Sequence, residues 1–178
     1  MVLKGKGLVM GEDRPGPTVE ELVPLHYAAL YRYAYRLSGS AGEAEDLTQE
    51  TFCTAQAKRG QLRDPERVKS WLFSILRNAY LHKQRSWKRL RAVSVEDLDG
   101  LCATPAEGEL PLIEPALLQE ALNSLAEEYR SPLILYYFAE FSYREIADHM
   151  QVPMGTVMSR LARAKAHLRR KLSAELEQ

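Results

Sequence analysis

The residues with the clearest chemical potential lie near the C-terminal end of this 178-residue chain. Between Thr156 and Leu172 there are six arginines and lysines and no acidic residue. An arginine can pair with a guanine through two hydrogen bonds, and a serine can bond to a base or to a phosphate. This composition therefore favours contact with a nucleic acid.

A helical conformation would separate these side chains onto two faces. At about 100° per residue the apolar residues form one buried stripe, and they are Val157, Leu161, Ala164 and Leu168. The opposite side contains small and cationic residues, which are Ser159, Ala162, Arg163, Ala166 and Arg170. Small residues beside arginines suit insertion into a major groove. The simpler alternative is a solvated cationic helix end, which the helix dipole also favours.

The residues just before this segment favour DNA reading over the simpler alternative. Ser142 and Glu145 have the spacing of a capping box, which predicts a helix from Tyr143. Pro153 suits a first helical position, so we expect it to end one helix and begin the next. Gly155 permits close approach of a phosphate or another backbone. A short helix, a tight turn and a second helix with a cationic face form the layout of a helix-turn-helix DNA-binding motif.

A second basic segment lies near the middle of the chain and follows several aromatic residues. Between Arg77 and Arg91 there are six basic residues and no acid. Single-stranded DNA binding uses aromatic side chains beside cations, because bases stack on the rings and phosphates pair with the cations. Phe73 and Tyr80 fit packing against the first helix better than base stacking. For Trp71 both interpretations remain open.

The segment from Glu43 to Phe52 has the opposite charge. In a helix its small and apolar residues share one face, and they are Ala44, Leu47, Thr48, Thr51 and Ala55. The opposite face contains Asp46, Gln49, Glu50 and Cys53. Taken alone, this pattern is more typical of a solvated acidic surface. Beside the basic segment, it is consistent with one domain that binds protein on an acidic face and nucleic acid on a basic face.

The rest of the chain offers little other chemistry. The 24 basic and 24 acidic residues balance, so the separation of charge along the chain is what favours contact with polyanions at two places.

The two cysteines are far apart and the four histidines form no cluster, so we expect no metal site and a reducing, cytoplasmic location. Cys53 and Cys102 are each expected to be ordinary half-buried cysteines, with a thiol sensor as the alternative. No nucleophile triad or phosphate-binding glycine loop is visible, so we expect no enzyme activity and no cofactor. No apolar run is long enough for membrane insertion.

The helix signals predict an all-α fold. We expect one helix from the Thr18 capping box to Gly39, a second from about Glu43 to Lys58 and a third after Asp64-Pro65 to about Leu90. Pro115 is expected to open the next helix, and Ser131-Pro132 to cap another. No strand of period two is apparent.

The domain organisation follows from these helices. Residues 92–115 contain six acids and no base, and their Pro and Gly content is typical of a flexible linker. We therefore expect two small helical domains, 18–91 and 116–178, joined by this acidic linker. Residues 1–17 lack the apolar core of a signal peptide and are expected to form a disordered tail.

Three segments together resemble bacterial sigma factors of the small, two-domain extracytoplasmic-function (ECF) group of the sigma-70 family. They are Asp46 to Phe52 (DLTQETF), Ser70 to Asn78 (SWLFSILRN) and Pro153 to Lys165 (PMGTVMSRLARAK). The resemblance covers nearly all of the chain from Leu22 to Leu172. It implies a sigma region 2-like bundle followed by a region 4-like helix-turn-helix domain. It also implies a promoter-specificity factor that binds core RNA polymerase, melts promoter DNA and directs transcription initiation.

The resemblance also implies roles for individual residues. Core polymerase, through its largest-subunit clamp helices, would contact Asp46, Gln49 and Glu50, and its flap would be a further contact. A flipped base of the minus-ten element would lie near the loop 60–68, and the residues implied for minus-ten binding and melting are Arg63, Lys69, Trp71, Arg77, Asn78, His82, Arg85 and Lys88. Those implied for the minus-thirty-five duplex are Thr156, Met158, Ser159, Arg160, Ala162, Arg163, Lys165 and Arg170. The acidic linker would thread a basic channel of the polymerase, and an anti-sigma factor is an expected partner.

Three positions depart from the family pattern. His82 stands where many relatives have an aspartate, and Met158 and Ala162 are apolar or small where others have larger or basic residues. These departures weaken any prediction of the promoter sequence.

Two other functions are compatible with parts of the sequence. A stand-alone helix-turn-helix repressor or activator would bind a two-fold-symmetric duplex without polymerase, but it leaves the acidic helix and linker unexplained. A sigma mimic that sequesters an anti-sigma factor would have no use for Arg163 or Asn78.

Overall fold

The computed structural model describes residues 17–62, 64–90 and 114–176, and their regular structure is entirely helical. The first group of elements is α1 (Val19–Ser38), α2 (Ala41–Ala57), two 3-10 turns, η1 (Arg59–Gln61) and η2 (Pro65–Arg67), and α3 (Val68–Leu90). The second is α4 (Pro115–Asn123), α5 (Glu127–Ala139), α6 (Tyr143–Met150) and α7 (Met154–Leu176). The expected tail and nearly all of the expected linker lie outside the described residues. We call α1–α3 the N-terminal unit and α4–α7 the C-terminal unit.

Local capping signals set most helix ends. The Thr18 side chain accepts from the Glu21 N–H while Glu21 accepts from the Thr18 N–H, so the predicted capping box is confirmed. Gly39 ends α1 with a φ of 75°, a left-handed conformation that glycine adopts without strain. The second helix begins at Ala41, earlier than predicted, because Ser40 caps it.

One predicted helix start is wrong. Helix α5 begins at Glu127, so Ser131 and Pro132 lie inside it rather than at its N-terminus. The Ser131 hydroxyl donates to the Glu127 carboxylate at 2.7 Å instead of capping a helix. Pro132 is buried within the helix, and packing of the surrounding helix stabilises a position that local preference disfavours.

Each unit buries an apolar stripe from every helix. The predicted small and apolar face of α2 is fully enclosed, with Leu47, Thr48 and Thr51 all 0% exposed. In α7 the predicted stripe is buried at Val157, Leu161 and Ala164, whereas Leu168 is partly exposed. These two stripes fix which side of α2 and which side of α7 faces solvent.

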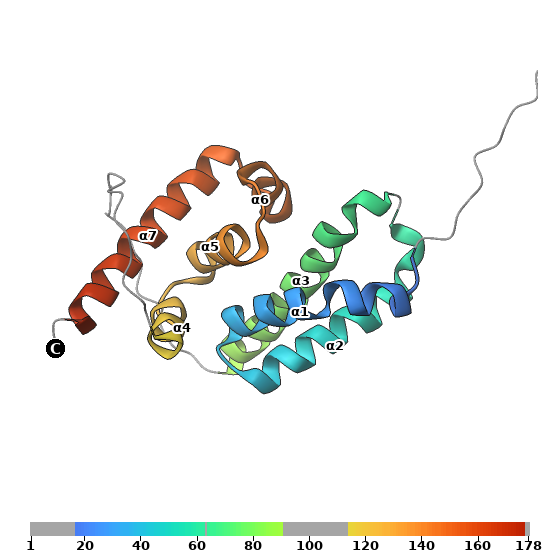
Figure 1. The fold of residues 1–178 in the computed structure, drawn as a ribbon, viewed down its shortest axis with the longest axis horizontal. Helices are drawn as coiled ribbons and strands as arrows, with labels where there is room; N and C mark the ends of the chain where they lie inside the picture. The colour runs from blue at the N-terminus through green and yellow to red at the C-terminus, as the bar shows by residue number, and fades with distance from the viewer. Residues whose placement is uncertain (1–16, 63, 91–113, 177–178) are drawn as a thin grey trace, which may run out of the picture.

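The two units pack against each other, which the sequence did not predict. Helix α5 lies between α7 and the N-terminal helices, α4 and α5 contact α1, and α6 contacts α3 (Figure 1). A continuous row of buried rings crosses the junction, because Phe73 lies 5.0 Å from Tyr33 and 5.1 Å from Phe141 between ring centroids. The expectation that Phe73 packs against the first helix is therefore confirmed. Tyr80 also packs there, and its hydroxyl donates to the Leu37 carbonyl at 3.0 Å.

Candidate nucleic-acid and protein interfaces

The turn between α6 and α7 is built by short-range hydrogen bonds. The Ser142 N–H donates to the Glu145 carboxylate at 2.8 Å, and the Glu145 N–H donates to the Ser142 hydroxyl at 3.3 Å. The Ser142 hydroxyl also donates to the Glu145 carboxylate at 2.6 Å. This bond, followed by the bond from the Ser142 N–H, holds the pKa of Glu145 below its usual range. Gln151 then reverses the chain with a φ of 56°. The carbonyl of Pro153 accepts from the N–H groups of Thr156 and Val157, so the predicted helix-turn-helix is confirmed, with Pro153 just before the first helical residue.

Helix α7 presents the predicted minus-thirty-five residues on its outer side. Met158, Ser159, Arg163 and Arg170 are exposed, and Thr156, Arg160, Ala162 and Lys165 are partly exposed. Met158 is 51% exposed, although its side chain is apolar. A helix with this face turned outward can enter a DNA groove without rearranging its own packing.

Two arginines on this face differ in how strongly the protein holds them. Arg160 forms an ion pair with Glu128 of α5, with 3.0 Å between Nη2 and Oε2. Arg163 makes only a long contact, 3.5 Å from its Nη1 to the Tyr129 hydroxyl. Arg163 is therefore the more available of the two for a base edge.

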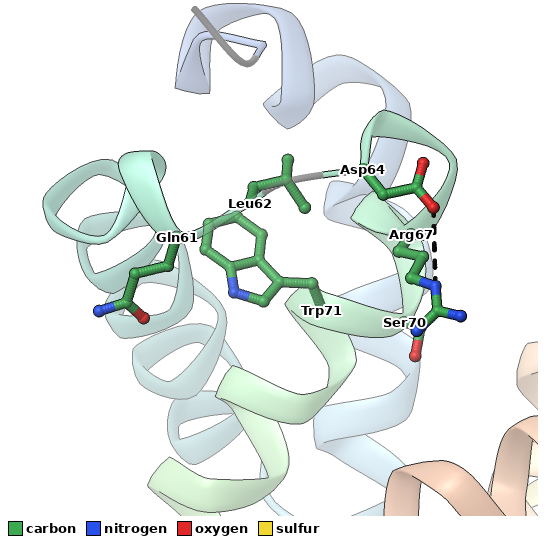
Figure 2. A pocket seen from close by; sticks show the side chains of 6 residues that line it. All are labelled: Gln61, Leu62, Asp64, Arg67, Ser70 and Trp71. Carbon is green, nitrogen blue, oxygen red and sulfur yellow. Dashed lines mark ion pairs between the residues drawn. The ribbon is translucent and has the colours of Figure 1, made fainter.

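A pocket of about 410 Å³ lies where the 3-10 turns meet the start of α3. Figure 2 shows the half-buried Trp71 indole beside Leu62, with polar side chains around the opening. The lining residues are Gln61, Leu62, Asp64, Arg67, Ser70 and Trp71. Arg67 Nε lies 3.6 Å from Asp64 Oδ2, and both side chains are largely exposed. A flat aromatic wall with hydrogen-bonding groups at its rim can accept an unstacked base.

Sequence reasoning anticipated a base-holding loop at 60–68 but missed most of this lining. Among the predicted minus-ten residues that the structure describes, Trp71 alone lies in the pocket. Gln61, Asp64, Arg67 and Ser70 were not predicted as site residues. The turn signal Asp64-Pro65 marked the loop, and the Asp64 side chain does cap it by accepting from the Glu66 N–H at 3.0 Å.

The other predicted minus-ten residues lie along α3 and divide into two groups. Asn78, His82 and Arg85 are exposed further along the helix. Lys69 and Arg77 are instead bound by the C-terminal unit. Arg63 and the side chain of Lys88 lie outside the described residues.

The contacts of Lys69 and Arg77 are specific. Lys69 Nζ donates to the Ala139 carbonyl at 2.7 Å and lies 5.0 Å from the centre of the Phe141 ring. Arg77 reaches Glu127 Oε1 with Nη2 at 2.9 Å and Nε at 3.1 Å, and its side chain is only 15% exposed. Arg77 is therefore largely covered by α5 in this arrangement, whereas Lys69 remains exposed although its Nζ is bound.

The acidic face of α2 is open. Asp46, Gln49 and Glu50 are all exposed, as predicted from the helical spacing. Cys53 is also exposed rather than half-buried, since it lies on this same face. Glu50 is 3.8 Å from Lys83 of α3, so one edge of the acidic face meets the basic helix. A pair this exposed contributes little to stability and leaves Glu50 available to a partner.

The described residues contain neither a cluster of metal-ligating side chains nor a membrane-spanning helix. Within residues 17–62, 64–90 and 114–176, no group of three or more His, Cys, Asp or Glu side chains could hold a metal ion. No helix in that part of the chain is long and apolar enough to cross a membrane.

The chain matches two family models in the expected order. Residues 22–90 match the model described as Sigma-70 region 2, and residues 116–168 match Sigma-70, region 4. These two ranges coincide closely with the N-terminal and C-terminal units.

Named relatives agree with these models. The ECF RNA polymerase sigma factor SigE of Mycolicibacterium smegmatis is 37% identical over 163 residues, which is 89% of this chain and 63% of that relative. This chain thus spans less than two thirds of the length of SigE. The ECF RNA polymerase sigma factor SigL of Mycobacterium tuberculosis is 35% identical over 147 residues, which is 81% of this chain and 82% of SigL.

Solved structures with the same fold are complexes with other proteins. One is the sigma factor RpoE in complex with the anti-sigma factor NepR from Bartonella quintana, with a TM-score of 0.70, 30% identity, and coverage of 86% of this chain and 96% of RpoE. Another is CnrH in complex with the cytosolic domain of CnrY, with a TM-score of 0.62, 25% identity and 88% coverage of both chains. The chain therefore belongs to the ECF group of the sigma-70 family, whose members are promoter-specificity factors that direct transcription initiation.

Proposed function

We propose that three surfaces of this sigma factor bind three different targets. The exposed acidic face of α2 (Asp46, Gln49 and Glu50) docks on the clamp helices of the largest subunit of core RNA polymerase. The pocket around Trp71, continued by the exposed polar residues of α3, takes the melted minus-ten element. The outer face of α7 reads the minus-thirty-five duplex.

The observation that carries this proposal is the arrangement of charge within the N-terminal unit. Helix α2 turns a carboxylate-bearing face to solvent, while the Trp71 pocket and Asn78 and Arg85 are exposed on α3. A protein partner with a basic surface and a DNA strand can therefore bind the same three-helix unit on different helices. A simple solvated surface would not need an aromatic pocket next to a basic helix.

Energetics support a role in melting without catalysis. Flipping a base out of the duplex costs a few kcal/mol, and stacking on an aromatic side chain is worth about 1–3 kcal/mol per base. Stacking on Trp71 and contacts at the pocket rim can offset that cost. We accordingly propose a binding protein in the cytoplasm, without enzyme activity or a cofactor.

Two more partners belong to the proposal. The flap of the polymerase would contact the C-terminal unit. An anti-sigma factor would bind the chain as NepR binds RpoE and as CnrY binds CnrH. The acids of residues 92–115 would follow a basic channel of the polymerase, since their charge resembles that of an RNA strand.

The experiment that tests the proposal is transcription in vitro by core polymerase and this protein over a library of randomised promoters. We expect the transcribed templates to share two elements at a fixed spacing, and we expect no transcripts without the protein. Both DNA-binding surfaces are held on one polymerase. Once one promoter element is bound, binding of the other element is therefore effectively intramolecular. Binding to a two-fold-symmetric duplex without polymerase, together with no initiation, would instead identify a stand-alone helix-turn-helix regulator.

A further inference from the structure

Two large apolar side chains stand exposed on successive turns of α7. Met154 is 52% exposed and Met158 is 51% exposed. The third methionine among the described residues, Met150, is 8% exposed and packs in the core. A single exposed apolar residue is normal on a protein surface, but neighbouring ones mark a contact site. The two methionines of α7 therefore call for a binding partner.

These methionines belong to a row of side chains along the helix. Residues four positions apart lie about 40° from one another around the helix axis, so Met154, Met158 and Ala162 share one side. Ala162 is partly exposed. We call these three residues the apolar row. Lys165 continues the same side at about 20° from Met154, so the row is apolar near the start of α7 and cationic further along.

The apolar row lies beside the polar part of the same outer face. Ser159 and Arg163 are about 100° and 140° around the helix from Met158, and both are exposed. Ser159 and Arg163 offer hydrogen-bonding groups to a partner, whereas the apolar row offers only methyl, methylene and thioether groups. Helix α7 thus presents two neighbouring rows with different chemistry.

The chemistry of the apolar row matches one feature of the DNA major groove. Among the base edges in that groove, the C5-methyl of thymine is the apolar group, and the other groups are hydrogen-bond donors and acceptors. Covering those polar groups with an apolar side chain leaves them without partners, which is costly. Methionine is unbranched and polarizable, so it adapts its shape to a methyl group. Met154 and Met158 also lie near the N-terminus of the second helix of the motif, where side chains reach base edges.

The charge around the apolar row favours DNA as its partner. The segment from Thr156 to Leu172 contains six basic residues and no acid. Arg163 and Arg170 are exposed beside the row, and Lys165 follows it. Cations on both sides of an apolar contact complement the phosphates that border a groove. The row is also continuous with the surface proposed above for the minus-thirty-five duplex.

We propose that the apolar row reads the methyl group of a thymine in the minus-thirty-five element, with Met158 as the main contact and Met154 beside it. This inference rests on the proposed function, which places the outer face of α7 on that duplex, and it adds the identity of a base. Met158 precedes Arg163 by five residues, or about 7.5 Å along the helix axis. At about 3.4 Å per base pair, the thymine lies roughly two base pairs from the base pair that Arg163 contacts.

The first test removes the methyl group from the DNA. Deoxyuridine has the hydrogen-bonding groups of thymine without the C5-methyl. Core polymerase with the full chain is offered promoter duplexes from the randomised library in competition, with each thymine of the minus-thirty-five element replaced in turn. We expect binding to weaken about fourfold at one thymine, the factor for one methyl group returned to water. At that position 5-methylcytosine should bind more tightly than cytosine by a similar factor, because the two differ only in the methyl group.

The second test removes the apolar side chains from the protein. Met154→Ala with Met158→Ala should bind the thymine and deoxyuridine promoters equally, and the helical circular dichroism should persist because both side chains are exposed. Met158→Leu retains an apolar side chain and should retain most of the difference. Leu25→Ala is the matched control, because Leu25 is an apolar residue of α1 that is 74% exposed. It should leave the preference for thymine over deoxyuridine unchanged.

The outcomes separate this inference from the function on which it rests. Equal binding of thymine and deoxyuridine by the unaltered protein, with a base preference that still depends on Arg163, would overturn the methyl contact and leave α7 as a DNA reader. An unchanged difference in the double methionine variant would also overturn it. Weaker binding of that variant to core polymerase without DNA, with no thymine preference in the unaltered protein, would identify the row as a protein contact instead. The absence of any base preference at the minus-thirty-five element would reject both proposals.

Discussion

Ser74 of α3 and His149 of α6 meet across the two units, with 3.0 Å between Ser74 Oγ and His149 Nδ1. The Ser74 hydroxyl also lies 2.9 Å from the Ser70 carbonyl, to which it can donate its one proton. In that arrangement His149 donates from Nδ1 and leaves Nε2 as a buried acceptor without a partner. A charged imidazolium would place an N–H donor at the buried Nε2 with no acceptor in the protein, so burial favours the neutral imidazole.

The first prediction concerns pH. Burial and the nearby Arg77 lower the pKa of His149 to about 4. Once exposed, the imidazole has its ordinary pKa of about 6.5. The free energy of unfolding is therefore insensitive to this group above about pH 6.5 and falls as pH drops from about 6.5 to about 4. Between pH 7 and pH 5 the loss should be on the order of 2 kcal/mol, measured by urea unfolding.

The control for this prediction is His149→Gln, which cannot titrate. The pKa values of His26 and His167 are also lowered by burial, but those groups are present in both proteins. The charged lining around His149, Arg77 and Asp148, is unchanged as well. The difference between the two pH profiles therefore isolates His149. Identical profiles would show that this imidazole does not titrate between the folded and unfolded states.

The second prediction concerns polymerase docking. Asp46→Lys with Glu50→Lys should abolish binding to core polymerase and leave the helical circular dichroism intact, because both side chains are exposed. Glu45→Lys reverses one charge on α2, half the change of the double variant, about 100° away from Asp46, and it should bind normally. Binding is measured by co-elution with core enzyme. Retained binding by the double variant would refute the docking face.

The third prediction concerns the pocket. Trp71→Ala should weaken binding of the polymerase complex to a single-stranded minus-ten oligonucleotide by about 1–3 kcal/mol, which is the value of one base stacked on an aromatic ring. Trp71→Phe should restore part of this loss. Tyr137→Ala removes an exposed ring on α5, outside the pocket, and should have no effect. A loss of equal size for Tyr137→Ala would point away from stacking at Trp71.

The fourth prediction concerns base reading by α7. Arg163→Ala should cost about 1–3 kcal/mol at one position of the minus-thirty-five element, because this exposed arginine has only one long contact. Arg160→Ala should weaken binding evenly across sequences, since the Glu128 pair holds Arg160 away from the bases. The readout is competition among duplexes that vary at each position. Even weakening by Arg163→Ala would reassign Arg163 to a phosphate.

The fifth prediction concerns the turn between α1 and α2. Gly39→Ala should destabilise the protein by about 1–2 kcal/mol through the left-handed φ alone, and an added Cβ would lie 2.6 Å from Asn123 Nδ2 of α4. Gly42→Ala is the control, since nothing lies within 4 Å of its Cβ position in α2. It should be neutral or slightly stabilising. Thermal unfolding compares the two, and equal melting temperatures would contradict the prediction.

The sequence by itself determined the local features of this protein. The capping residues at Thr18 and Ser142 act within one helical turn, so spacing alone located two helix starts. The exposed carboxylates of α2 and the outward side chains of α7 follow from the angle between successive residues. The three short motifs, taken together and in their order along the chain, were specific enough to indicate the family. Each motif defines both the buried face of a helix and the side chains that this helix exposes.

Tertiary structure decided what no short-range pattern encodes. Pro132 lies inside α5 because packing outweighs local preference. Gln61 and Ser70 share a pocket with Trp71 because two 3-10 turns fold back onto α3. Arg77 has the composition of a DNA-binding residue, yet it meets Glu127, which lies 50 positions further along the chain. Such pairings depend on how whole helices pack, and helix packing is set by many weak contacts summed over the molecule rather than by the neighbours of any one residue.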